Sequence, residues 1–106
     1  MELKIYGLIV ETIGVLRVEM DAIQRRNVDL AEQMRRAAAS IALNTSEGSY
    51  SRGRNRQARY HTALGSARET LACIEVAVAL GYIPAVREDV RARLRQILGT
   101  LTNLSR

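Results

Sequence analysis

Residues 29–48 read DLAEQMRRAAASIALNTSEG, and this stretch decides the fold. Apolar side chains recur in it at alternating spacings of four and three, which is the pattern of one face of an α-helix. Asp29 and Glu32 have the spacing of a capping box, in which the side chain of each residue accepts a hydrogen bond from the backbone N–H of the other residue. We therefore predict a helix that opens near Asp29 and stops at Gly48. Its expected core residues are Leu30, Met34, Ala37 and Ile41.

The segment before this stretch also has helical spacing. We predict a first helix from Leu3 to Gln24, and its apolar residues lie on nearly all sides. A strand over 3–10 is the alternative, because branched residues are frequent there, but the apolar pattern continues to Ile23 and favours a helix. A helix that is apolar on more than one side needs cover beyond its own bundle. Self-association is therefore expected.

Two more helices follow residue 48. After a polar turn from Ser49 to Asn55, the third helix runs to Gly81, and Pro84 suits the first turn of a fourth. The expected core residues of these two helices are Tyr60, Leu64, Ala67, Leu71, Ile74, Val78, Val90, Leu94, Ile97, Leu101 and Leu104. Short connections make consecutive helices antiparallel neighbours. The predicted fold is all-α, an antiparallel up-and-down four-helix bundle in a single domain spanning residues 1–106.

Charge is concentrated in one part of the chain. The net charge is +5, and the segment from Gly48 to Arg68 accounts for all of it with five arginines and no acidic residue. The longest uncharged stretch, from Val76 to Val86, has eleven residues, whereas a membrane-spanning helix needs about 20 apolar residues. The start of the sequence lacks the pattern of a secretory signal. We expect a cytoplasmic protein.

The residues that could support catalysis are few. His61 is the single histidine and Cys73 the single cysteine, and neither has a metal or nucleophile partner at a suitable spacing. We expect His61 to lie at the surface or at an interface, and Cys73 to be buried like a small apolar residue. Glycines with phosphate-loop spacing are absent from the sequence. The sequence therefore predicts no enzyme, no catalytic residues, no metal site and no cofactor.

The strongest candidate site is a cluster of arginines at the start of the third helix, where cations oppose the helix dipole and an external anion would offset them. These residues, expected to point outward, are Arg52, Arg54, Arg56 and Arg59. Tyr50 and Tyr60 flank the cluster and could stack on bases or ribose. RNA or DNA is the favoured ligand; an acidic protein partner, a subunit interface and a solvated face are the alternatives.

Two other groups of polar residues have structural explanations. Asn44 continues the core stripe of residues 29–48, so we expect its amide to be hydrogen-bonded and to fix the register of the packed helices. We expect the carboxylate of Glu47 to bond the loop that carries the arginines. Elsewhere, Arg35 and Arg36 can pair with Glu32 at helical spacing. A stripe on the fourth helix could extend the basic surface; it consists of Arg87, Arg91 and Arg95. The alternative is that Glu88 and Asp89 pair with Arg91 and Arg93 at helical spacing.

Several motifs between residues 33 and 83 resemble one bacterial family. They are Gln33 to Ala38 with Ser40 and Ile41, Asn44 to Gly48, Ala63 to Ser66 with Glu69, and Leu80 to Ile83. The chain resembles the four-helix-bundle proteins of ribosomal RNA intervening sequences, and more distantly the accessory proteins of diversity-generating retroelements. The resemblance implies a homo-oligomer, a pentameric ring, without enzymatic activity. It also marks Asn44, Glu47, Gly48 and Glu69 as structural residues.

Together these features predict a non-enzymatic, oligomeric basic bundle that binds RNA or DNA through the arginine cluster and Tyr50. The alternative is an oligomeric scaffold that recruits a protein partner through the same arginines or the apolar first helix, without a role in nucleic-acid binding.

Overall fold

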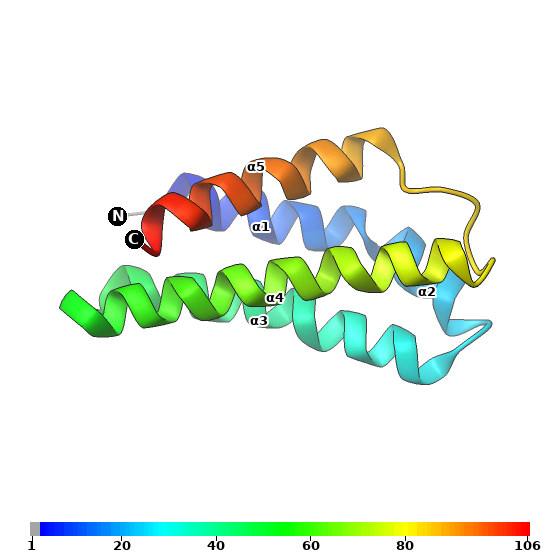
Figure 1. Ribbon diagram of the computed structural model, residues 1–106, viewed down its shortest axis with the longest axis horizontal. Helices are drawn as coiled ribbons and strands as arrows, with labels where there is room; N and C mark the ends of the chain where they lie inside the picture. The colour runs from blue at the N-terminus through cyan, green and yellow to red at the C-terminus, as the bar shows by residue number, and fades with distance from the viewer. Residues whose placement is uncertain (1–2) are drawn as a thin grey trace.

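The computed structural model describes residues 3–106, which form five α-helices and no β-strand. The helices are α1 (Leu3–Val15), α2 (Arg17–Gln24), α3 (Val28–Tyr50), α4 (Gly53–Ala79) and α5 (Glu88–Leu104). Helices α1 and α2 follow one another as a single rod, so there are four rods, and each runs opposite to the one before it (Figure 1). The prediction of an all-α bundle is confirmed.

The first rod differs from the predicted unbroken helix over 3–24. One residue, Leu16, lies in a turn between α1 and α2, although its N–H still donates to the Thr12 carbonyl at 2.9 Å. At this turn the Val15 carbonyl accepts a hydrogen bond from Nη2 of Arg87 at 2.8 Å. The interruption therefore coincides with a side chain from outside the rod that binds its backbone.

Helix α3 begins differently from the prediction. Its N-cap is Asn27, whose backbone is extended and whose Oδ1 accepts a hydrogen bond from the Leu30 N–H at 3.0 Å. The predicted capping box of Asp29 and Glu32 is therefore wrong. Asp29 lies in the first turn instead, where its negative charge still suits the positive end of the helix dipole.

The end of α3 also differs from the prediction. The helix continues past Gly48 to Tyr50, so Gly48 does not stop it. Gly48 is helical and buried, and a Cβ atom at this position would lie 2.9 Å from Cε1 of the Tyr60 ring. The glycine allows α3 and α4 to approach each other closely at this level.

The connection from α3 to α4 is shorter than the predicted turn over 49–55. Only Ser51 and Arg52 lie between the two helices. Gly53 then begins α4 with a φ of +57°, a left-handed value that glycine adopts without steric cost. Helix α4 consequently starts earlier than the sequence suggests.

Helix α4 buries a wider face than predicted because it packs against both α3 and α5. The predicted core residues that are buried are Tyr60, Leu64, Ala67 and Ile74. Leu71 and Val78 are only half-buried. Outside the predicted stripe, the buried residues of α4 are Ala63, Thr70, Cys73 and Ala77. The predicted core residues of α4 lie on one stripe of the helix, which would contact a single partner helix. Helix α4 packs against two helices and therefore buries a wider face.

Helix α5 begins at Glu88, four residues later than a first turn at Pro84 requires. Its N-cap, Arg87, has an extended backbone. The predicted core residues Val90, Leu94, Ile97 and Leu101 are buried, and Leu104 is half-buried. Residues 80–87 therefore form an irregular connection between α4 and α5.

One hydrophobic core joins all five helices. The most extensive helix contact is between α3 and α4. Small buried residues are frequent in both helices, which suits a close approach of their backbones; the buried alanines of these helices are Ala31, Ala37, Ala38, Ala42, Ala63, Ala67 and Ala77. Helices α3 and α4 thus form the most tightly joined pair in the bundle.

Candidate nucleic-acid interface

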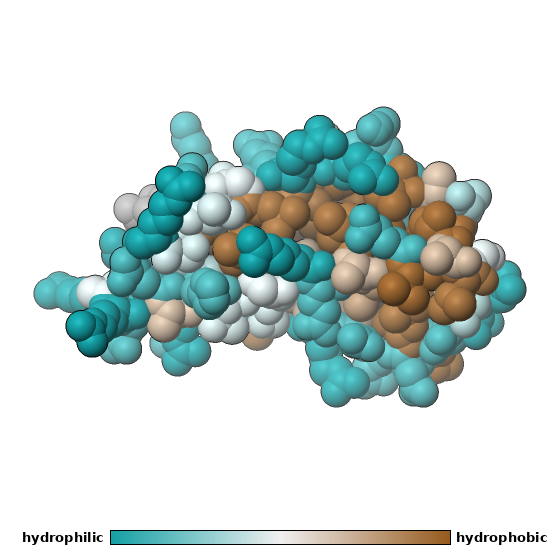
Figure 2. All heavy atoms as spheres, in the orientation of Figure 1, coloured by the Kyte–Doolittle hydropathy of each residue, from teal (hydrophilic) through white to brown (hydrophobic). Residues whose placement is uncertain are grey.

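The hairpin that joins α3 to α4 projects beyond the rest of the bundle. Figure 1 shows its end lying past the ends of α1 and α5. From residue 49 to residue 59 no side chain is buried, and Tyr60 is the first buried residue of α4. We call residues 49–59 the tip. Hydrophilic residues cover this end of the molecule (Figure 2).

The tip concentrates positive charge. It carries Arg52, Arg54, Arg56 and Arg59 and no acidic residue. Arg52 is the N-cap of α4, and within the part of the chain that the structure describes its side chain makes no capping hydrogen bond. The first turn of this helix contains no acidic residue. The positive end of the helix dipole therefore adds to the guanidinium charges, and each exposed cation there costs about 0.3–1 kcal/mol. An external anion would reverse this penalty.

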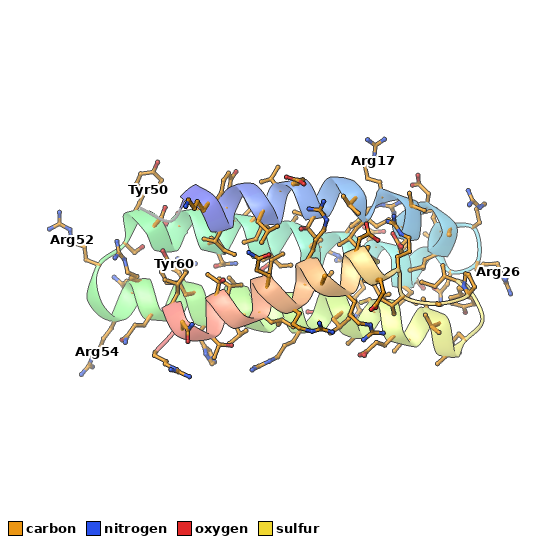
Figure 3. All side chains as sticks on the ribbon, turned by 90° about the horizontal axis from the view of Figure 1, so that it is seen from above. Arg17, Arg26, Tyr50, Arg52, Arg54 and Tyr60 are labelled. Carbon is orange, nitrogen blue, oxygen red and sulfur yellow. The ribbon has the colours of Figure 1, made fainter. Side chains whose placement is uncertain are left out.

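Arg52 and Arg54 extend away from the protein. Figure 3 shows the two side chains leaving the end of the bundle in different directions. Both residues are exposed. Among residues 3–106, the ion pairs of arginine side chains are those of Arg35, Arg87 and Arg93, none of which lies in the tip. The guanidinium groups of Arg52 and Arg54 are therefore open to an external ligand.

Arg56 and Arg59 do not point freely outward as expected. Arg56 donates from Nε to the Ser51 carbonyl at 3.1 Å and from Nη2 to the Ser49 carbonyl at 3.3 Å. These bonds satisfy carbonyls at the end of α3, which lack partners within the helix. Arg59 donates from Nη1 to Oδ1 of Asn44 at 3.5 Å. All of these acceptors are uncharged, so both arginines keep their net charge at the tip.

The two tyrosines that flank the arginines in sequence are separated in space. The side chain of Tyr50 is 76% exposed, whereas that of Tyr60 is 1% exposed. Tyr60 packs against Gly48 in the core, and Figure 3 shows Tyr50 at the surface near Arg52. Tyr60 is therefore excluded from direct stacking on a nucleic acid, and Tyr50 is the aromatic residue that the tip presents.

Asn44 is half-buried and joins helices α3 and α4. Its Nδ2 donates to the carbonyl and to Oγ of Ser40, each at 3.0 Å, and Ser40 Oγ lies 2.7 Å from Oγ of Ser66 on α4. The fully buried polar residue at this level is Thr45, whose Oγ1 has no hydrogen-bond partner among residues 3–106. The amide is therefore hydrogen-bonded, but it lies at the edge of the core, and its role in fixing the register of the helices stays a prediction.

The other residues expected to be structural have different contacts. Glu47 is exposed, and it is its backbone carbonyl that accepts a bond from Oγ of Ser51 at 2.8 Å. The predicted bond from its carboxylate to the arginine loop does not occur among residues 3–106. Glu69 is exposed and accepts a hydrogen bond from Nε2 of Gln33 at 3.1 Å. Glu69 therefore links α4 to α3, and Gly48 lies against Tyr60 as described above.

A second surface feature is an apolar groove between the first rod and α3. Its volume is about 400 Å³, and its lining residues are Ile13, Met20, Arg35, Ala39, Ala42 and Leu43. Leu43 is 68% exposed, and Tyr6 and Val10 on α1 are also exposed. The first rod therefore presents apolar residues to solvent, which agrees with the expectation that its own bundle covers it incompletely.

Sequence reasoning missed an ion pair at the opposite end of the bundle, between the buried Glu19 and the partly exposed Arg87. Nε and Nη2 of Arg87 donate to the two carboxylate oxygens of Glu19 at 2.7 and 2.8 Å. The signal was available, because Glu19 lies at core spacing between Leu16 and Ile23. The basic stripe predicted on α5 therefore does not include Arg87 as a free cation.

Two other expected pairings also differ. Arg35 pairs with Asp21 at 3.7 Å and donates to Oε1 of Gln24, in place of the predicted partner Glu32. On α5, Arg93 pairs with Glu11 of α1 at 2.9 Å. In both cases the partner belongs to another helix, because the antiparallel packing brings it closer than a residue one turn away.

The family described as 23S rRNA-intervening sequence protein matches residues 10–103. The chain belongs to this family. No curated protein and no solved structure matches it. The match contains the whole tip and the whole apolar groove of this intervening-sequence protein, whereas the more distant resemblance to retroelement accessory proteins stays a prediction.

Within residues 3–106 of this intervening-sequence protein, no group of His, Cys, Asp and Glu side chains could hold a metal ion. Across the same residues, no helix has the length and apolar character that crossing a membrane requires. His61 is exposed on α4, and Cys73 is buried in the core as a free thiol. Both residues lie where the sequence analysis expects them.

Burial should make Cys73 unreactive. Burial, and secondarily the charge of Glu69, raises the pKa of this thiol, so at any alkaline pH it contains less thiolate than a free cysteine. We expect a disulfide reagent to modify Cys73 about a hundredfold more slowly in the folded protein than in urea. Because the folded-state pKa is raised, this group stabilises the fold less as the pH rises above the ordinary thiol pKa. Equal rates of Cys73 modification in buffer and in urea would show that the thiol is not protected by burial.

Proposed function

We propose that this protein is a non-enzymatic, oligomeric RNA-binding bundle that contacts phosphate groups through Arg52, Arg54, Arg56 and Arg59, with Tyr50 beside them. The observation that carries the proposal is the pair of guanidinium groups of Arg52 and Arg54, which extend from the tip without a carboxylate partner among residues 3–106. Arginine binds phosphate through a planar fork of N–H donors. The proposal includes no cofactor and a cytoplasmic location.

The basic tip, and not the family name, supports a nucleic acid as ligand. The description of the family refers to the intervening sequence of 23S rRNA, which states where such genes lie and not what the proteins bind. The arginines of the tip are the feature of this chain that suits a phosphate backbone. The arginines lie where α3 meets α4, the two helices with the most extensive contact in the bundle.

The salt dependence of binding tests this proposal. If the tip neutralises about four phosphates, the logarithm of the association constant should fall with the logarithm of salt concentration at a slope of about −3 to −4. Arg54→Gln should make the slope shallower by about one. Fluorescence anisotropy with a labelled RNA, recorded over a salt series, measures both values.

Arg17→Gln provides the matched control because it removes the same charge from an exposed arginine distant from the tip (Figure 3). Its slope should stay close to that of the wild type. A flat salt response of the wild-type protein, or equal effects of Arg17→Gln and Arg54→Gln, would contradict binding at the tip. A stoichiometric oligomer without affinity for nucleic acid would favour the alternative, a scaffold that binds a protein.

The proposal also includes self-association through the apolar groove, and the family resemblance implies a pentameric ring. The groove leaves Leu43 largely exposed beside Ile13 and Met20. Leu43→Glu should therefore reduce the particle mass to that of a monomer, because a buried unpaired carboxylate would oppose the contact. Light scattering after size exclusion of nuclease-treated protein measures the mass.

Val28→Glu is the control for this substitution. Val28 is also exposed on α3, but it lies in the first turn, where a negative charge suits the helix dipole. This variant should keep the wild-type mass. A wild-type protein that is already monomeric, or a Leu43→Glu variant of unchanged mass, would rule out the groove as the subunit contact.

A further inference from the structure

Binding of single strands depends on aromatic side chains that stack on bases, and the tip presents few of them. The sequence has no Phe and no Trp, and it has four tyrosines. Tyr60 is in the core, Tyr82 lies under the guanidinium of Arg26 at the other end of the bundle, and Tyr6 is exposed on α1, outside the tip. Tyr50 is therefore the only tyrosine within residues 49–59, and one ring cannot form a stacking platform alone.

The width of the tip limits how it can meet a double helix. Two packed helices, each about 10 Å in diameter with axes 8–10 Å apart, form an end about 20 Å across. The major groove of B-DNA is about 12 Å wide, and that of an RNA duplex is narrower still. With its two helices side by side across a groove, the hairpin is too wide to enter either of these major grooves. It can lie across a groove and touch the two backbones that border it.

The directions of the two free arginines suit this placement. Arg52 precedes α4 on extended backbone, Arg54 lies in the first turn of α4, and Gly53 between them has a positive φ that turns the chain. Their side chains leave the tip in different directions (Figure 3). Two guanidinium groups that diverge from one end can each bind a phosphate on a separate backbone.

The geometry points to a double-helical ligand: the tip lies across a groove of duplex nucleic acid, and Arg52 and Arg54 bind phosphates of opposite strands. This inference rests on the proposed function and adds the class of nucleic acid. The shared chemistry is that of two phosphate backbones, which duplex RNA and duplex DNA both offer. Binding should be largely independent of base sequence, because phosphate contacts carry no sequence information.

The test compares four labelled probes of equal length by fluorescence anisotropy at one low salt concentration: an RNA duplex, a DNA duplex and one unstructured single strand of each kind. We expect at least one duplex to bind about tenfold more tightly than its single strand. Arg52→Gln and Arg54→Gln should each make the salt slope on that duplex shallower by about one. Tyr50→Ala should change its affinity less than about twofold, since no base is stacked.

The outcomes separate this inference from the proposed function. Tight binding to single strands that equals or exceeds binding to both duplexes would overturn the inference and leave the proposed function intact. A loss on Tyr50→Ala larger than that on Arg52→Gln would also overturn it, because stacking would then dominate. No binding to any of the four probes would overturn the proposed function itself. A preference for duplex RNA over duplex DNA, or equal binding to both, supports the inference.

Discussion

Replacing Arg87 with methionine is expected to lower the free energy of unfolding by about 2–3 kcal/mol, since the change leaves the buried carboxylate of Glu19 without its partner. The cost is below that of a fully buried pair because the side chain of Arg87 is 40% exposed. Glu19 is 4% exposed, and both of its carboxylate oxygens accept hydrogen bonds from Arg87. Methionine keeps much of the apolar stem of arginine, so the loss is mainly one of charge pairing. Urea-induced unfolding followed by circular dichroism measures the change.

Two companion variants make this prediction specific. Arg93→Met removes an arginine whose partner, Glu11, is 64% exposed, so it should cost less than about 1 kcal/mol. Combining Glu19→Leu with Arg87→Met should recover most of the loss, because apolar residues can replace a buried pair at little cost. If Arg87→Met destabilised the protein no more than Arg93→Met, the pair would have no special role in stability.

The pair should act over the whole neutral pH range. The hydrogen bond with Glu19 raises the pKa of Arg87 above its ordinary value. A raised folded-state pKa contributes stability that is fully present below the ordinary pKa and is lost only as the pH rises through the higher one. For a guanidinium group this loss lies far above neutral pH. The ion pair of Arg87 with Glu19 therefore joins the first rod to the start of α5 throughout the neutral pH range.

Replacing Gly48 with leucine is expected to lower the free energy of unfolding by about 3 kcal/mol through overpacking. A Cβ atom at position 48 would already lie 2.9–3.1 Å from three ring atoms of Tyr60. The ring is 1% exposed and has core residues around it, so it cannot move into solvent to make room. The same unfolding measurement applies.

Gly65→Leu is the matched control for this substitution. Gly65 is an exposed residue inside α4, and a Cβ atom there would meet nothing within 4 Å. Leucine is a better helix former than glycine, so this variant should be more stable than the wild type by about 0.5–1 kcal/mol. Effects of the same sign at positions 48 and 65 would contradict the close approach of α3 and α4 as the reason for Gly48.

The accuracy of the predicted local structure depends on how many competing residues the sequence offers at each helix end. Asn27 and Asp29 are both good caps, and the extended backbone at Asn27 decides between them. Glycine can end a helix or permit a close contact, and only the position of the Tyr60 ring shows that Gly48 does the second. Helix boundaries were therefore less predictable than the existence of the helices.

The residues of the candidate site could be predicted from the sequence, but the contacts and directions of their side chains could not. The charge of the tip is a property of the sequence, because four arginines occur there without an acidic residue. Which of them are free depends on neighbouring carbonyls and amides: Arg56 is bonded to Ser49 and Ser51, and Arg59 to Asn44. Spacing along the chain does not predict these hydrogen bonds, because they form only after α3 and α4 have packed side by side.

By itself, the sequence determined that the chain is helical, that its apolar residues require a bundle, and that its excess positive charge lies at one helical hairpin. These properties follow from periodicity and composition, which act over one or two helical turns. The tertiary structure alone decided that Tyr60 is buried, that Arg52 and Arg54 diverge from a projecting tip, and that Arg87 meets Glu19. That last pair is separated by 68 residues, and contacts at such separations are set by how the rods pack together.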